Sequence, residues 1–156
     1  MAKKEKTLKQ LKKDLWKVFS IYVRMRDGGV CFSCRKKIPN YYDRQGNLKP
    51  GWKAAQAGHW ITAANCGIAL YFHEKNVHCQ CHRCNINLSG NWLEYEFWMI
   101  KTYGKGICEE LKSMKWKGQV EFTHEEYKEK IKYYKNIIES ASHGGSIKRD
   151  EPLPTL

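Results

Sequence analysis

Four cysteines stand in two pairs, with two residues between the members of each pair. The first pair is Cys31 and Cys34, and the second is Cys81 and Cys84. Two intervening residues let both sulfurs of a pair reach one ion, and zinc takes four such soft ligands in a tetrahedron. The spacing therefore predicts a structural zinc site that joins two distant parts of the chain. Because four thiolates close the coordination shell, any catalysis would need a second, harder metal.

The remaining cysteines leave alternatives open. If Cys79 lies in a strand, alternation puts it on the same face as Cys81, where it could compete as a ligand. Cys66 and Cys108 fit small buried hydrophobic positions. No apolar segment follows the charged N-terminus, so we expect no signal peptide and a reducing cytosol, where paired Cys-x-x-Cys motifs favour metal over disulfides. The alternative is two thiol clusters that hold no metal.

Three polar residues could carry out phosphodiester hydrolysis. This reaction requires an activated water and a cation on the scissile phosphate. His59 can be the general base, since an ordinary histidine pKa near 6.5 suits proton abstraction at neutral pH. Asn85 can offer an amide oxygen to Mg²⁺ or Mn²⁺, which prefer oxygen ligands. Asn76 can hold its loop and orient His59 by hydrogen bonding.

Apolar periodicity and turn residues predict a mixed α and β chain. A capping box begins at Thr123, where Glu126 stands three residues on. We expect helices over 7–25, from near Cys84 or Asn85, over 92–103, over 107–114 and over 123–140. Strands are expected over 56–62, 69–72 and 77–80, and a loop over 39–51. The whole divides into a basic amphipathic N-terminal helix (1–28), a zinc-bound core (29–104), C-terminal helices (105–141) and a disordered tail (142–156).

The charge of the chain favours a polyanionic partner. The formal net charge is +12 and the pI about 9.4, which indicates nucleic acid first and an anionic membrane surface second. Apolar residues make up 42% of the chain, enough for a core, but no run of about 18 exists to span a membrane. Binding to phosphates would be sensitive to salt. The candidates are the N-terminal lysines, among them Lys3 and Lys4, and the knuckle residues Arg35, Lys36, Lys37 and Arg83.

In order and spacing, these motifs resemble a known family. Gln56-Ala-Gly-His-Trp-Ile61, the run from Leu70 to Asn85, and Leu88-Ser-Gly-Asn-Trp92 are similar to the phage NinG (Rap) recombination family. The Cys-x-x-Cys-Asn ending also resembles the zinc-containing HNH, or His-Me finger, nucleases of the endonuclease VII type. The resemblance implies an α+β fold, with a small ββα-metal core stapled by a four-cysteine zinc site and flanked by helices. It also implies an enzyme that cuts branched recombination intermediates in the cytoplasm of a bacterial host.

One position departs from the HNH pattern. Many such sites have an acidic metal ligand directly before the catalytic histidine, but here that residue is Gly58. If two strands form the usual hairpin, a residue near His78 lies opposite Gly58, and His78 could share the catalytic Mg²⁺ or Mn²⁺ with Asn85. The alternative is that His78 is a buried, hydrogen-bonded strand histidine. Glu74 is a weaker ligand candidate and fits a turn residue better.

Three functions remain open from the sequence. The first is a metal-dependent, structure-selective endonuclease resembling a Holliday-junction resolvase. It would act as a homodimer, because a four-way junction is cut on two strands. The second is an HNH nicking or general DNA endonuclease without junction preference. The third is a non-catalytic zinc module that binds nucleic acid, which the absence of an acid at Gly58 supports. The amphipathic N-terminal helix and the stripe from Tyr127 to Ile138 offer dimer surfaces.

Overall fold

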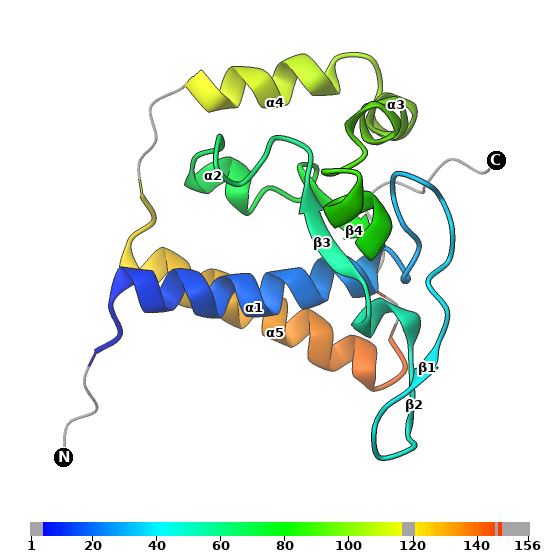
Figure 1. Cartoon of the computed structure of the whole chain (residues 1–156). Helices are drawn as coiled ribbons and strands as arrows, with labels where there is room; N and C mark the ends of the chain where they lie inside the picture. The colour runs from blue at the N-terminus through cyan, green and yellow to red at the C-terminus, as the bar shows by residue number, and fades with distance from the viewer. Residues whose placement is uncertain (1–4, 117–120, 146, 148–156) are drawn as a thin grey trace.

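The structure, a computed structural model, describes residues 5–116, 121–145 and 147, and the chain is α+β as the sequence predicts (Figure 1). Small antiparallel sheets lie among helices. The elements in chain order are α1 (Leu8–Arg26), β1 (Tyr41–Tyr42), β2 (Leu48–Lys49), the 3₁₀ turn η1 (Gly51–Lys53), β3 (Gln56–His59), α2 (Ile68–Tyr71), β4 (Val77–Gln80), the π-helical turn η2 (Arg83–Asn87), α3 (Trp92–Tyr103), α4 (Ile107–Trp116) and α5 (His124–Ser142).

The two longest helices, α1 and α5, lie side by side along one edge of the molecule (Figure 1). Each begins with a capping box. Thr123 accepts a hydrogen bond from the Glu126 amide, and the Glu126 side chain accepts one from the Thr123 amide in return, which confirms the predicted start of α5. The apolar stripes of both helices are buried against each other. The stripe proposed as a dimer surface is therefore used inside the chain.

A hairpin of β3 and β4 stands between this helical pair and the α3–α4 pair (Figure 1). The strands are antiparallel, and Gly58 pairs directly with His78, which confirms the predicted register. Since side chains alternate along a strand, the hairpin has two faces. One face carries Ala57, His59, Val77 and Cys79. The opposite face carries Gln56, Gly58, His78 and Gln80.

Each face of the hairpin belongs to its own hydrophobic cluster. Val77 is buried with residues of α1 and α5 such as Phe19 and Tyr127. On the other side, Phe32, Tyr95 and residues of α3 and α4 form a second cluster. The buried ion pair of Arg26 and Asp27 ties the end of α1 to β4. The Arg26 guanidinium donates to the Val77 carbonyl at 2.8 Å, and the Asp27 carboxylate accepts from the Cys79 amide at 2.8 Å.

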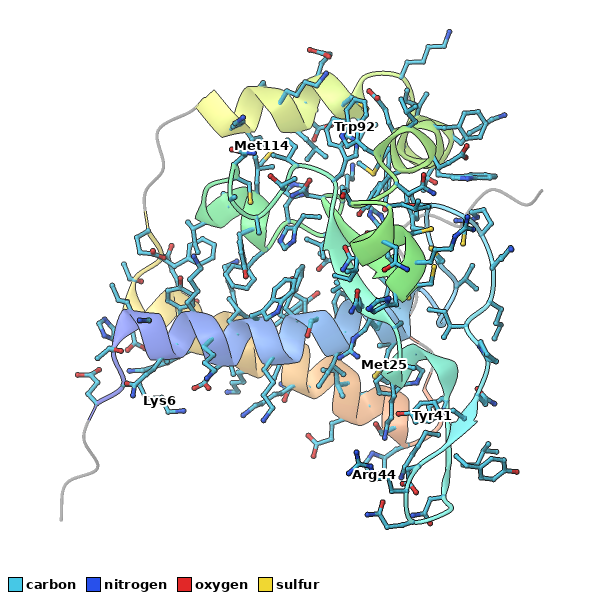
Figure 2. The ribbon with its side chains drawn as sticks, in the orientation of Figure 1. Lys6, Met25, Tyr41, Arg44, Trp92 and Met114 are labelled. Atoms are coloured by element: carbon cyan, nitrogen blue, oxygen red, sulfur yellow. The ribbon has the colours of Figure 1, made fainter. Side chains whose placement is uncertain are left out.

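Two local predictions were wrong. The strand expected over 69–72 is one helical turn, α2, in which the Tyr71 amide donates to the Gly67 carbonyl. Ile68 and Leu70 are buried and Ala69 is exposed. In so short a segment that alternation fits a strand as well as a helical turn. The loop expected over 39–51 contains the small β1–β2 hairpin, marked by Tyr41 and Arg44, which projects from the rest of the molecule (Figure 2).

Helix α5 is the last element of the described chain. Helix α5 reaches Ser142, at the start of the expected disordered tail. Most of that tail, and also Lys3 and Lys4, lie outside the described residues. Among the helices of the described ranges, none is both long and apolar enough to cross a membrane.

Candidate functional site

The four predicted zinc ligands lie together. The Sγ atoms of Cys31, Cys34, Cys81 and Cys84 are all within 4.8 Å of one another, and those of Cys34 and Cys81 are 3.9 Å apart. Tetrahedral zinc with bonds of about 2.3 Å to sulfur places its ligands about 3.8 Å apart, so the cluster has the size the metal needs. Cys79 does not belong to it. Cys79 is buried on the face of the hairpin that carries Ala57 and Val77, and its backbone amide donates to the Asp27 carboxylate.

The four thiols of this cluster can all be deprotonated at once only if a cation stabilises the thiolates. Burial raises the pKa of the Cys31 and Cys84 thiols. In contrast, the pKa of Cys81 is lowered, because hydrogen bonds from its neighbours outweigh the effect of burial. A bound Zn²⁺ would stabilise all four thiolates, so the residues present fit a structural zinc ion. Among the described residues, this is the one group of His, Cys, Asp or Glu close enough to hold a metal in this way.

His59, at the end of β3, is half-buried between α1 and α2. Its ring stacks on Trp16 with centroids 5.2 Å apart, and its Nε2 atom lies 3.0 Å from the Tyr71 carbonyl oxygen. A carbonyl only accepts, so Nε2 carries the proton and Nδ1 holds the lone pair. Burial lowers the pKa of His59, and the bond to Tyr71 offsets part of this shift. His59 is thereby held as a neutral imidazole whose Nδ1 can accept a proton.

Asn76 is fully buried and clamps the segment after His59. Its side-chain oxygen accepts from the Ile61 amide at 2.8 Å, and its Nδ2 donates to the carbonyls of Ile61 and Leu70. Leu70 precedes Tyr71, whose carbonyl holds the His59 ring. Asn76 therefore acts on His59 through the loop between β3 and β4 and makes no direct bond to the ring.

His78 is fully buried and both of its ring nitrogens face tyrosine hydroxyls. Nδ1 lies 2.9 Å from Tyr95 Oη, and Nε2 lies 2.8 Å from Tyr103 Oη. Because the Tyr95 hydroxyl donates to the Gly58 carbonyl at 2.8 Å, His78 Nδ1 donates to Tyr95 and Nε2 accepts from Tyr103. Of the two interpretations of His78, metal ligand or buried strand histidine, the contacts match the buried, hydrogen-bonded histidine. The arrangement leaves no ring nitrogen for a metal ion, so His78 does not serve as a ligand.

The space above Gly58 is filled by amide side chains. A Cβ atom on Gly58 would overlap Gln80 Oε1 and would stand 2.9 Å from Asn85 Oδ1. No side chain, acidic or otherwise, fits at position 58 while Gln80 keeps this place. Asn85 lies on η2, and its Nδ2 donates to Gln56 Oε1 at 2.8 Å. The structure thus gives a steric reason for the missing carboxylate.

Glu74, the weaker ligand candidate, has a structural environment. Its two carboxylate oxygens accept hydrogen bonds from the Tyr22 and Tyr134 hydroxyls at 2.7 and 3.0 Å. These bonds join α1 and α5 to the turn before β4. Burial and the Glu74 charge raise the pKa of both tyrosine hydroxyls well above the usual range for tyrosine.

The candidate DNA-binding residues surround the cysteine cluster. Lys36 and Lys37 follow the first knuckle, Arg83 lies within the second, and all three are exposed. The cluster brings the two knuckles side by side, so these charges gather although they are far apart in sequence. Arg35 differs, because its guanidinium lies 4.6 Å from the centre of the Trp98 ring and is half-buried. The Arg35 side chain therefore packs against Trp98 of α3.

Sequence reasoning missed two residues of this region. Gln80 follows His78 by two positions, so alternation already placed it on the face of Gly58. It was overlooked because glutamine is not a usual catalytic residue. Tyr95 bonds to Gly58 across 37 positions, a contact that no local pattern indicates.

Comparisons with known proteins find relatives among phage proteins. A family model described as the bacteriophage lambda NinG protein matches residues 1–143. The Protein ninG sequences of Escherichia phage lambda and Salmonella phage P22 are each 31% identical over 93 residues, 59% of this chain and 39% of theirs. Protein ninG of Enterobacteria phage H19B is 39% identical over 57 residues, 36% of this chain and 28% of its own length.

The chain therefore spans about two fifths of the length of the first relatives it matches. No solved structure matches it. The family model covers most of the sequence, including both knuckles, His59 and all of α3 and α4, and the chain belongs to the NinG family of phage proteins.

Proposed function

We propose that the chain is a metal-dependent, HNH-type endodeoxyribonuclease that cuts branched DNA intermediates. The observation that carries the proposal is the state of His59. One ring nitrogen is fixed on the Tyr71 carbonyl, the ring is stacked on Trp16, and burial holds it neutral. A histidine held in this way is a general base ready to act near pH 7.

In this proposal His59 is the base and Asn85 lies beside the divalent cation, while Asn76 and the cysteine cluster support them. His59 Nδ1 takes the proton of the attacking water, while the bond from Nε2 to Tyr71 keeps the ring in one orientation. Asn76 maintains the loop that provides this carbonyl. A divalent cation held near Asn85 supplies Lewis-acid stabilisation of the phosphate and the leaving oxygen. The cysteine cluster, loaded with zinc, fixes η2 and so the position of Asn85.

Recognition of DNA follows from charge around the knuckles. Lys36, Lys37 and Arg83 are exposed beside the cluster, and in this proposal their charges lie along the phosphate backbone. Contacts of this kind are to phosphates and carry no sequence information. They favour recognition of shape, and binding should weaken steeply with salt.

A homodimer is part of the proposal, because paired cuts need two sites. The side chains that support it lie on α3, where Leu93 is 76% exposed and Phe97 and Ile100 follow on the same helical face. Sedimentation velocity tests this surface. Leu93→Glu should give a monomer, whereas Leu48→Glu, at an equally apolar exposed position on β2, should leave the dimer intact. A monomeric parent protein would contradict the proposal.

The activity is tested on labelled four-way junction, Y-shaped and linear duplex DNA, with Mg²⁺ or Mn²⁺ and with EDTA. We expect paired, symmetric cuts in the junction only. His59→Ala should lower the cleavage rate about 10²–10⁴-fold with DNA binding preserved. The matched control is His143→Ala, which removes an exposed histidine at the end of α5. Equal rates for His59→Ala and the control would refute the role of His59.

The same experiment separates the other two functions. Equal cutting of all three DNA forms would identify a general HNH nicking enzyme or endonuclease. Binding without cutting at any metal concentration would identify a zinc module that only binds nucleic acid.

A further inference from the structure

Gln80 is a buried amide whose orientation is fixed. Its Nε2 atom donates to the Gly90 carbonyl at 2.8 Å and lies 2.6 Å from Ser33 Oγ. A carbonyl cannot donate, so the nitrogen must be on this side and Oε1 on the other. Ser33 lies between the first two zinc ligands and Gly90 follows η2. The zinc-linked parts of the chain therefore aim Oε1 at the hairpin.

The Gln80 oxygen is an orphan acceptor. Within the described residues, Oε1 is buried and accepts no hydrogen bond, and the Gln80 side chain is fully buried. A buried polar atom of this kind is costly unless something compensates it. Asn85 Nδ2 donates to Gln56 Oε1, and no hydrogen bond joins it to Gln80 Oε1. A ligand that is attracted to oxygen would remove the cost.

A second amide oxygen faces the same place. Asn85 Oδ1 lies 2.9 Å from the point where a Gly58 Cβ would stand, and Gln80 Oε1 lies closer still. Two carbonyl-type oxygens repel each other unless a donor or a cation lies between them. Hard divalent cations take such oxygens and retain several waters. Asn85 is only half-buried, so an ion and its waters could enter from that side.

We infer that Gln80 and Asn85 together hold the divalent cation, and that Gln80 replaces the carboxylate that position 58 lacks. The inference rests on the proposed function and names the ligands of that same site. It explains why residue 58 is glycine, since the Gln80 oxygen takes the room of a Cβ. Two neutral ligands bind a cation less tightly than a carboxylate does, so the phosphate of bound DNA contributes to holding it.

Mn²⁺ binding to the zinc-loaded protein without DNA tests this inference, with free Mn²⁺ measured by electron paramagnetic resonance. Gln80→Met keeps the length of the side chain and removes the oxygen, and Asn85→Leu does the same on η2. Each should weaken Mn²⁺ binding about tenfold or more. The controls Gln45→Met and Asn87→Leu alter exposed amides, the second on the same turn, and should bind as the parent does.

A ligand swap makes the test independent of any fault in folding. Gln80→Ala alone should lose Mn²⁺ binding, and adding Gly58→Asp should restore it, because the new Cβ no longer meets the Gln80 oxygen. Zinc content and the thermal midpoint identify any variant that has lost its fold. If Gln80→Met loses zinc, Asn85→Leu and the swap decide.

The outcomes separate this inference from the proposed function. Mn²⁺ binding that depends on Gln80 but is followed by no cleavage of DNA would support the ligand set and refute the nuclease. Metal-dependent cleavage with unchanged Mn²⁺ binding in folded Gln80→Met would overturn the inference and leave the nuclease standing. A parent protein that binds no Mn²⁺ would also overturn it.

Discussion

The two faces of the β3–β4 hairpin each carry two of its four residue pairs, and they are built in opposite ways. Toward α1, Ala57 and Val77 pack in an aromatic and aliphatic cluster, and His59 is the histidine on this face. Toward the cysteine cluster, Gln80 and His78 form a chain of hydrogen bonds with tyrosines and knuckle residues. One face is held by hydrophobic packing, and the other adds to its own hydrophobic cluster a set of polar contacts near Gly58.

The two histidines show what this difference means for chemistry. His78 is satisfied at both nitrogens by hydroxyl groups that can donate or accept, so it is fixed and structural. His59 is tied at one nitrogen to a carbonyl, which leaves the other as a base. Residue type does not separate them, since both are histidines of the hairpin, although they lie on opposite faces. The identity of the partner does.

The largest expected effect is from removing the metal of the cysteine cluster, which should damage one face only. Chelation, or Cys84→Ser, removes the link between the two knuckles. Structural zinc sites contribute on the order of 10 kcal/mol to folding. We expect protection of amides in the two knuckles and η2 from hydrogen exchange to collapse, while the α1 and α5 amides stay protected. Loss of protection in both regions together would show that the faces are not separate units.

Next in size is Tyr95→Phe, which breaks the polar face at a single atom. The hydroxyl of Tyr95 donates to the Gly58 carbonyl and accepts from His78. Its loss removes two buried hydrogen bonds, at a cost of about 1–3 kcal/mol each. Thermal unfolding measures the loss. Tyr133→Phe, at an exposed position on α5, is the matched control and should change the midpoint little.

Much of this region followed from local sequence. The spacing of the four cysteines was enough to predict their cluster, because two residues between ligands restrict where the sulfurs can point. The hairpin usual in the resembled fold predicted a residue near His78 opposite Gly58, and His78 itself is found there. The capping box at Thr123 located α5. Two of these, the cysteine spacing and the capping box, depend on residues that are close in sequence.

What the sequence could not provide depends on distant partners. The role of His78 is decided by Tyr95 and Tyr103, which come from α3. The orphan oxygen of Gln80 exists because Ser33 and Gly90 take its nitrogen, and those residues lie in two other segments. The turn over Ile68–Tyr71 was misread as a strand because four residues are too few for helical and strand periods to differ.

A smaller effect is expected from pH, acting on the apolar face. Burial lowers the pKa of His59 in the folded chain, so the unfolded chain takes up a proton first as the pH falls. The contribution of neutral His59 to the free energy of unfolding is present above about pH 6.5. It is lost as the pH falls below that value, at no more than about 1.4 kcal/mol per pH unit. Burial lowers the pKa of His73 as well. Denaturant unfolding between pH 5.5 and 7.5 gives the free energy of unfolding at each pH. Plotted against pH, this free energy should therefore rise less steeply for His59→Gln than for the parent protein. Equal slopes would exclude His59 from the pH dependence.

The smallest expected effect is from Trp16→Leu, which tests whether the stacked ring tunes the base. Trp16 covers one face of the His59 ring, and its removal lets water approach. Less desolvation raises the His59 pKa, so the acidic limb of the cleavage profile should move to higher pH by less than about one unit. The bond to Tyr71 remains, so the rate at the plateau should fall little. Trp98→Leu, on the other side of the hairpin, should leave the limb in place. If both variants shifted it equally, the aromatic face would have no special part in setting the base.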